Sequence, residues 1–152
     1  MSCTIDIMSH VSPGSIDLSE VELFLQRIFI FLGIDEKECS LTFCDDEEIA
    51  ELNMSYRKKE GPTDILSFVQ LDSVDEDFPV DESILGDMII SLDTLKRNAN
   101  YFNVSEDVEL HRLLIHGVLH LIGMDHETNN SNEPMLILQE KILEDLLEKR
   151  VE

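Results

Sequence analysis

The stretch HGVLHLIGMDH, residues 116–126, contains three of the five histidines of this 152-residue chain. It overlaps a longer segment, residues 108–122, in which most positions are apolar. At about 3.6 residues per turn, His116 and His120 lie one turn apart on the same helix face. Because the other faces are apolar, we expect this helix to be buried, with its polar stripe facing a cavity or polar partners. That stripe contains four residues: Glu109, Arg112, His116 and His120.

The spacing of the three histidines indicates a metal centre. His116 and His120 can reach one ion together, and Gly123 can end the helix and turn the chain so that His126 reaches the same ion. Three neutral imidazoles with one open position are typical of a catalytic zinc site, and no Cys lies near enough to close it. We therefore predict one Zn²⁺ per chain, whose bound water would have a pKa of about 7. Asp125 could be a ligand or could support one, and both interpretations stay open.

The same spacing occurs in the zinc-peptidase motif H-E-x-x-H-x-x-G-x-x-H, with one decisive difference. In those peptidases a Glu follows the first His and acts as general base, whereas this chain has Gly117. A glycine inside a helix indicates that another part of the protein approaches it closely. A peptidase that takes its base from elsewhere remains an alternative. His10 and His111 have no comparable neighbours, so we expect both to be structural.

Length and composition indicate a single globular domain spanning residues 1–152, with 43% hydrophobic and 29% charged residues. The longest apolar run without a His, at about residues 28–34, is far shorter than the roughly 18 residues of a membrane span. The first twenty residues contain no Lys or Arg, so we expect no signal peptide. Three cysteines without a Cys-x-x-Cys pair predict buried free thiols in a reducing cytoplasm.

Local patterns predict four strands and five helices. The strands are expected at residues 4–8, 39–43, 65–70 and 88–90, and the helices at residues 19–32, 45–53, 92–100, 106–122 and 133–149. We expect Ser19 to cap the first helix, Gly33 to end it, and Asp45 with Glu48 to open the second as a capping box. The acidic residues 72–82 are expected to form a loop. This order of elements indicates an α/β or α+β fold with one small sheet.

The histidine motif resembles the signature of the YbeY-type endoribonucleases, bacterial metalloproteins of ribosomal RNA maturation. Three other stretches are similar to patterns of this family: NMSYR at 53–57 to N-x-x-Y-R, TDILSF at 63–68 to T-D-V-L-S-F, and LGDMII at 85–90 to its G-D-I strand. Glu133 and Met135, which precede an apolar helix, also fit. The chain departs from the family in having Val69 where Pro is frequent, and in a net charge of −22 in place of a basic RNA cleft.

The resemblance implies a single-domain α+β fold with αβα layers, a small mixed sheet, and zinc held by His116, His120 and His126. It implies hydrolysis of single-stranded RNA in maturation of the 16S ribosomal RNA 3′ end and in ribosome quality control. The ribosome or its proteins would then be partners, in the cytoplasm and away from any membrane. The alternatives are another zinc-dependent hydrolase, or a non-catalytic ribosome-associated module in which zinc stabilises the fold.

Arg57 matches the functional arginine of the family, and its planar cation could clamp phosphate and stabilise developing negative charge. The neighbouring Lys58 and Lys59 would contact backbone phosphates, although a solvated turn explains them equally well. A surface ion pair with Glu60 is the alternative interpretation of Arg57. The general base stays open among residues of the right type, which are Asp64, Asp87 and Glu109.

Overall fold

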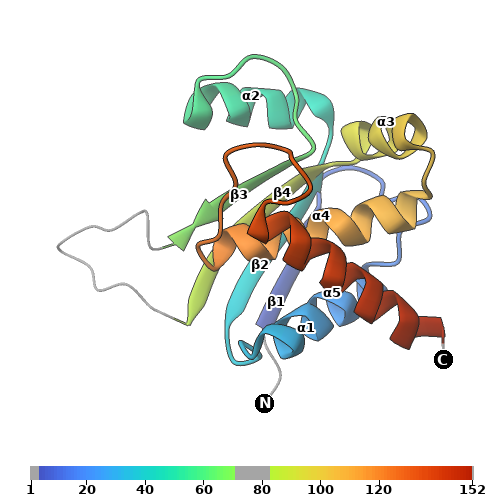
Figure 1. Cartoon of the computed structure of the whole chain (residues 1–152). Coiled ribbons are helices and arrows are strands. Elements are labelled where there is room, and N and C mark those ends of the chain that lie inside the picture. Colours follow the sequence, from blue (N-terminus) through green and yellow to red (C-terminus); the bar gives the residue numbers. More distant parts are fainter. Residues whose placement is uncertain (1–3, 71–82, 152) are drawn as a thin grey trace, which may run out of the picture.

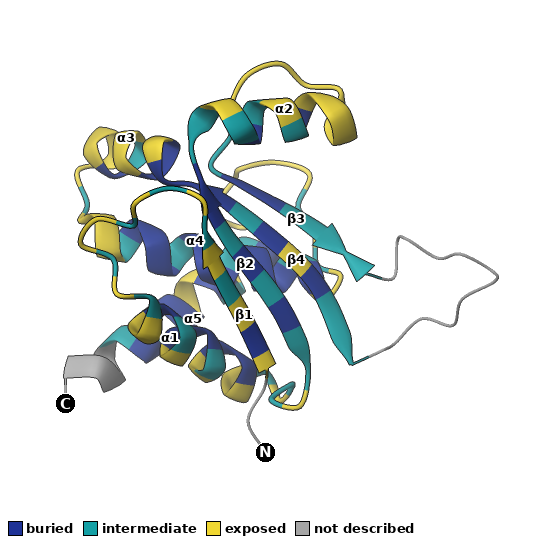
Figure 2. Cartoon of the chain, turned by 180° about the vertical axis from the view of Figure 1, so that it is seen from behind, coloured by how far each residue is buried: buried dark blue, intermediate teal, exposed yellow. Residues whose placement is uncertain are grey.

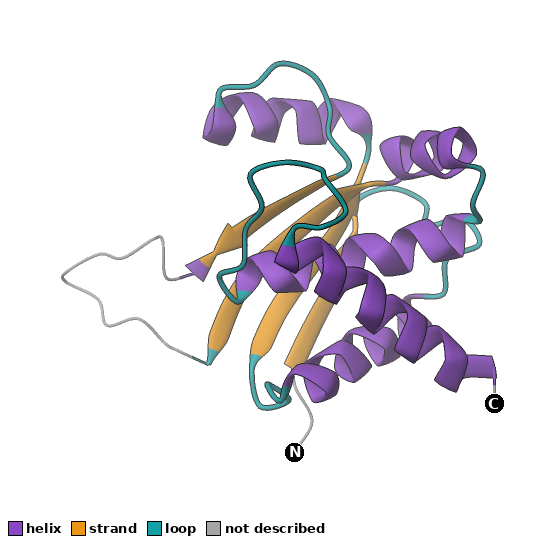
Figure 3. Ribbon diagram, viewed as in Figure 1, coloured by secondary structure: helices purple, strands orange, loops and turns teal. Residues whose placement is uncertain are grey.

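The computed structural model describes residues 4–70 and 83–151, which form an α+β fold (Figures 1 and 3). The strands are β1 (Thr4–Ser9), β2 (Glu38–Cys44), β3 (Ile65–Val69) and β4 (Ile84–Ser91). The helices are α1 (Leu18–Leu32), α2 (Asp46–Arg57), α3 (Leu92–Phe102), α4 (Glu106–Leu121) and α5 (Pro134–Val151). The predicted fold class and the types of its elements are confirmed. The expected acidic loop at 72–82 and Cys3 lie outside the described residues.

The sheet is mixed, with strand order β1-β2-β4-β3. The first three strands of that order run parallel, and β3 pairs antiparallel with β4 at the edge of the sheet. In the register, Met88 of β4 lies opposite Leu41 of β2 on one side and Ser67 of β3 on the other. Met88 therefore occupies the middle of the sheet, and its side chain points to the face that α4 covers.

Three helices, α1, α4 and α5, cover one face of the sheet and enclose the main core (Figure 1). Side chains from α1 (Leu25, Ile28), α4 (Leu114, Leu119) and the strands (Leu41, Met88, Ile90) are fully buried there. Helix α2 covers only part of the other face, where Ile49 packs with Leu66 in a smaller cluster. Figure 2 shows this side, on which exposed residues alternate along β1 with buried or half-buried ones. Among the described residues, no helix is long and apolar enough to cross a bilayer.

Helix ends follow the expected capping chemistry in part. As predicted, Gly33 ends α1 in the left-handed conformation, and Asp45 caps α2 by accepting a hydrogen bond from the Glu48 amide. The other half of the predicted capping box is not formed, because the Glu48 carboxylate binds His10. The prediction that Ser19 caps α1 is wrong, because Asp17 is the N-cap and accepts from the Ser19 amide at 2.9 Å. An aspartate two residues earlier supplies the same kind of acceptor and starts the helix at Leu18.

The second helix and the fourth strand are both longer than predicted. Helix α2 continues past Asn53 to Arg57, because its C-cap is Lys58, a non-glycine residue in the left-handed conformation with φ 58°. Strand β4 begins at Ile84 because it pairs on both sides, with β2 and β3, and this pairing outweighs the poor strand propensity of a Gly-Asp pair. The remaining ends differ from prediction by one or two residues.

Two glycines allow chain segments to approach closely. A Cβ at Gly117 in α4 would lie 2.5 Å from the Met88 sulfur and 2.8 Å from Cδ1 of Ile65, which confirms the expected close approach to this helix. A Cβ at Gly86 in β4 would lie 2.0 Å from the Phe68 carbonyl oxygen, and φ at Gly86 is +145°. Backbone cannot yield as a side-chain tip can, so Gly86 is the stricter requirement.

Replacement of Gly86 with Ala is expected to lower the free energy of unfolding by about 2–5 kcal/mol, because backbone strain and overpacking act together. Urea unfolding followed by circular dichroism measures the change. Gly14→Ala is the matched control, since Gly14 also has a positive φ, of 62°, but a Cβ there would meet nothing within 4 Å. Equal losses in the two variants would contradict the proposed clash with Phe68.

Candidate metal centre

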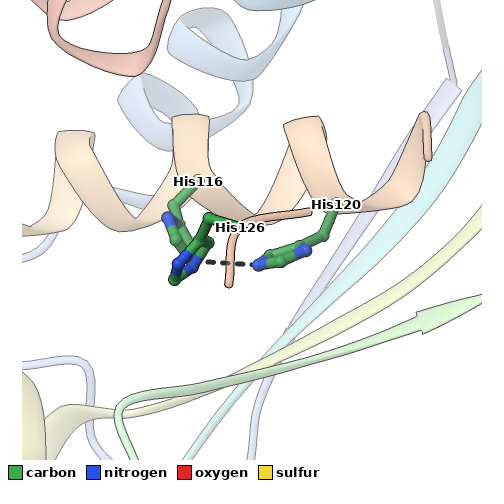
Figure 4. A group of neighbouring side chains, drawn as sticks. All are labelled: His116, His120 and His126. Carbon is green, nitrogen blue, oxygen red and sulfur yellow. Dashed lines mark hydrogen bonds between the residues drawn. The ribbon is translucent and has the colours of Figure 1, made fainter. Parts of the chain in front are cut away.

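Helix α4 places His116 and His120 together because its apolar faces are fixed by the core. Ser105 caps its N-terminus by accepting from the Val108 amide at 3.1 Å, and ten residues of the helix are buried. The two imidazoles, one turn apart, emerge from the remaining polar stripe and are half-buried (Figure 4). Their ring centroids are 4.6 Å apart.

The turn after α4 brings in the third imidazole. Gly123 adopts a φ of +98°, its amide donates to the His120 carbonyl at 3.0 Å, and the chain then reverses, as predicted. His126 thereby comes to within 5.3 Å of the His116 ring and 5.7 Å of the His120 ring, measured between centroids. Asp125 supports this turn, because its carboxylate accepts from the His126 amide at 2.8 Å.

These three histidines are a group that could hold one metal ion. One ligand atom from each lies within 4.8 Å of the other two, and among the described His, Cys, Asp and Glu side chains this group contains only the three imidazoles. Asp125 is outside the group, which favours a supporting role over ligation. The spacing in the sequence thus predicted which side chains the fold brings together.

Hydrogen bonds fix the orientation of all three rings. The Nδ1 atom of each ring faces a carbonyl oxygen. His116 Nδ1 lies 2.6 Å from the side-chain oxygen of Gln139. His120 Nδ1 lies 3.0 Å from the backbone oxygen of Met124, and His126 Nδ1 lies 2.8 Å from the backbone oxygen of Thr128. A carbonyl oxygen only accepts, so each Nδ1 carries a proton, and in the neutral ring the lone pair is then on Nε2.

The donor set fits a divalent cation with a preference for imidazole. The Nε2 atoms of His116 and His120 face each other at 3.0 Å, and with both protons on Nδ1 no proton lies between them. A cation stabilises this arrangement of two lone pairs. Burial lowers the pKa of His116 and of His120, which favours the neutral form that a metal ligand requires.

Two side chains that sequence reasoning did not assign to the site support the imidazoles. Gln139 of α5 accepts the His116 proton, and Glu133 accepts from both the amide and the hydroxyl of Thr128, at 3.0 and 2.8 Å. Glu133 thereby holds the segment whose carbonyl receives the His126 proton. The hydrogen bonds from Thr128 lower the pKa of Glu133. Gln139 had a signal in the sequence, namely a polar residue on the apolar stripe formed by Met135, Ile142 and Leu146.

The candidates for the general base lie in different places. Asp87 accepts from the Ser40 hydroxyl at 2.5 Å on the sheet face away from α4, so it lies outside the cluster. Asp64, just before β3, is close enough to act electrostatically on both His116 and Glu109. Glu109 is buried on α4, and this burial raises its pKa. The structure therefore narrows the choice to Asp64 and Glu109.

Arg57 is exposed at the C-terminal end of α2, which packs on the sheet face opposite α4. Neither a hydrogen bond nor an ion pair joins it to the imidazoles, or to Glu60, within the residues that the structure describes. Lys58 and Lys59 are exposed beside it, so the three cations form a solvent-facing basic turn. The role of Arg57 stays a prediction.

The two remaining histidines lie outside the cluster. His10 binds the Glu48 carboxylate at 2.7 Å, and His111 is buried with its ring stacked on Phe24 at 4.1 Å between centroids. Cys39 and Cys44 are buried free thiols, as expected. Burial raises the pKa of Cys44 to about 12, so its thiol stays protonated.

The fold and the site together define a small α+β protein with three convergent imidazoles at the end of a buried helix. The family model described as Endoribonuclease YbeY matches residues 12–147, and the chain belongs to this family. Proteins named Endoribonuclease YbeY include one from Treponema denticola, 45% identical over 86% of this chain and 84% of that protein. Another, from Syntrophus aciditrophicus, is 40% identical over 88% of this chain and 82% of that protein. The solution structure of a Thermotoga maritima protein is similar to this one, with a TM-score of 0.65 and 27% sequence identity. The match covers 96% of this chain and 91% of that protein.

Replacement of His120 with Ala is expected to abolish stable Zn²⁺ uptake, since loss of one of three ligands exceeds the ~10–100-fold cost of losing an outer-shell partner. Elemental analysis after dialysis against Zn²⁺ and gel filtration measures the stoichiometry. His10→Ala is the matched control, because His10 is held by Glu48 away from the cluster. One equivalent of zinc retained by folded His120→Ala protein would contradict the assignment.

Proposed function

We propose that this chain is a metal-dependent endoribonuclease that hydrolyses single-stranded ribosomal RNA, with one Zn²⁺ bound by His116, His120 and His126. The observation that carries the proposal is the convergence of three imidazoles, each with one ligand nitrogen within 4.8 Å of the others, in a member of the endoribonuclease YbeY family. Three neutral imidazoles leave a fourth position for solvent or substrate, as catalytic zinc sites do. We further propose maturation of the 16S ribosomal RNA 3′ end and ribosome quality control as the setting, with the ribosome as partner.

A divalent ion at this position supplies Lewis acidity and water of lowered pKa. The chain itself prepares the site, since the outward Nδ1–H donors hold the imidazoles correctly turned. Burial favours the neutral form of His116 and His120. Asp64 and Glu109 remain the candidates to accept a proton, because Asp64 acts electrostatically on both His116 and Glu109. The raised pKa of Glu109 brings its carboxyl nearer to neutral pH, where proton exchange is efficient.

Peptide hydrolysis is disfavoured by the surroundings of Gly117. In zinc peptidases the residue that follows the first His is the Glu that acts as general base. Here the space that a side chain at 117 would need is filled by Met88 and Ile65. The helix is therefore packed too tightly against the sheet at this position to accommodate that catalytic group.

The basic turn at 57–59 supports RNA as substrate despite the net charge of −22. A uniform negative surface would repel phosphate, whereas three adjacent exposed cations create a local site for it. Arg57 offers a planar donor fork for phosphate, and no acid in the described residues occupies it. We propose that Arg57 binds a phosphate of the substrate RNA.

Cleavage of an end-labelled single-stranded oligonucleotide, with its duplex as comparison, tests the proposal. The Zn²⁺-loaded protein is expected to cut the single strand, and His116→Ala is expected to lose zinc and cleavage together. A peptide substrate run in parallel is expected to stay intact. RNA cleavage by folded, zinc-free His116→Ala protein, or peptide cleavage without RNA cleavage, would contradict the proposed function.

Arg57→Glu is expected to keep one equivalent of zinc and to lower cleavage about tenfold or more, because a phosphate donor is replaced by a like charge. Initial rates at fixed ionic strength measure the effect. Arg27→Glu is the matched control, since Arg27 is also an exposed helix arginine and the change in net charge is the same. Equal rates in the two variants would remove Arg57 from the substrate site.

A further inference from the structure

Gln139 is a polar residue in the apolar contact between α4 and α5. It is 6% exposed and lies on the same stripe of α5 as Met135 and Leu146, which are 1% and 4% exposed. A buried amide costs about 1–3 kcal/mol unless its hydrogen bonds are made. Both ends of this amide are occupied: Oε1 lies 2.6 Å from His116 Nδ1, and Nε2 donates to Glu140 Oε2 at 3.1 Å.

Arg112 fixes Glu140 from the neighbouring helix. Its Nε and Nη2 donate to the two carboxylate oxygens of Glu140, each at 3.0 Å, in a two-point fork. The third guanidinium nitrogen, Nη1, lies 3.7 Å from the carboxylate of Glu109. The guanidinium thus lies between two carboxylates, and both Arg112 and Glu109 belong to the polar stripe of α4 that carries His116.

These contacts have a direction that begins at Arg112. A guanidinium only donates, and an ionised carboxylate only accepts, so the Gln139 group that faces Glu140 must be the NH₂. Its carbonyl oxygen must then face His116, whose Nδ1 must carry the proton. We propose that Arg112, Glu140 and Gln139 form a positioning relay that holds the His116 proton on Nδ1 and so turns its Nε2 lone pair towards the metal centre.

The other two imidazoles do not need such a relay. Their Nδ1 protons are accepted by backbone carbonyls, those of Met124 and Thr128, which present only an acceptor. A side-chain amide, in contrast, can turn by half a revolution and present its NH₂ group in place of its oxygen. His116 alone depends on a group of reversible polarity, and Glu140 with Arg112 sets that polarity.

The charge of Glu140 is consistent with this role. Burial alone would raise the pKa of Glu140, but the hydrogen bonds from Arg112 and Gln139 outweigh it and hold this pKa below its ordinary value. The carboxylate therefore stays ionised, and remains an acceptor, throughout the neutral range. The inference deepens the proposed function, because it concerns the same metal centre.

The tautomer of His116 in the metal-free protein is the direct readout. Two-bond ¹H–¹⁵N correlation spectra are expected to show His116 and His120 with the proton on Nδ1 in the wild type. In Gln139→Leu, His116 is expected to shift towards the Nε2–H form while His120 stays unchanged as an internal reference. Competition with a chromophoric chelator is expected to show a Zn²⁺ affinity about 10–100-fold lower.

Glu140→Gln tests the far end of the relay. The amide that replaces this carboxylate can donate or accept, so Gln139 loses its imposed orientation, and we expect mixed His116 tautomers and an intermediate loss of Zn²⁺ affinity. Glu144→Gln is the matched control, because Glu144 is exposed one turn further along α5 and loses the same charge. Gln139→Glu keeps an acceptor for His116 Nδ1 and is expected to retain the Nδ1–H tautomer.

The relay would be overturned if His116 kept its proton on Nδ1 in Gln139→Leu, or if Glu140→Gln and Glu144→Gln altered Zn²⁺ affinity equally. Retention of the wild-type tautomer in Gln139→Glu separates the loss of an acceptor from a general loss of packing. Tautomer and affinity are both measured without RNA. Absence of RNA cleavage by the wild-type protein would therefore overturn the proposed function without altering these two results.

Discussion

Three imidazoles can share one cation only when each presents an unprotonated nitrogen to the same point, and here that condition is met by hydrogen bonds on the far side of every ring. The three acceptors come from different parts of the chain: the Gln139 side chain on α5, and the backbone carbonyls of Met124 and Thr128 in the turn after α4. The geometry of the site therefore depends on two structural features, the reversal at Gly123 and the packing of α5 on α4.

The features of this site that the sequence predicted are those set by residues close together in the chain. An i,i+4 pair on a helix and a glycine turn are local features that bring His116, His120 and His126 near one another, and the structure has this arrangement. Gly117 was informative for a similar reason, because a helical glycine indicates a close neighbour, which proved to be Met88. Helix ends were predicted less well. Helix α2 continues beyond Asn53 and ends at Lys58, which adopts a left-handed conformation. Because Lys58 is not a glycine, the sequence does not indicate this helix end.

The supporting residues could not be predicted, because they are set by tertiary packing. Gln139 lies 23 residues from His116 in the chain, and only the docking of α5 on α4 brings the two together. A polar residue on an apolar stripe shows that a partner exists but does not identify it. Likewise, Asp87 has the right chemistry for a base. The pairing of β4 with β2 and β3 directs its side chain to the other face of the sheet, where Ser40 binds it.

The choice of an amide at position 139 is consistent with the charge of this protein. A carboxylate there would also accept the His116 proton, but it would stand directly beside Glu140 and add to a chain that already carries −22. Two carboxylates at hydrogen-bond distance repel each other, so the acceptor would be gained at a cost in stability. A neutral amide donates to Glu140, which Arg112 holds, and accepts from His116, and it adds no charge. Arg112 neutralises the negative charge of Glu140, and Gln139 separates this ion pair from the His116 imidazole that the pair helps to orient.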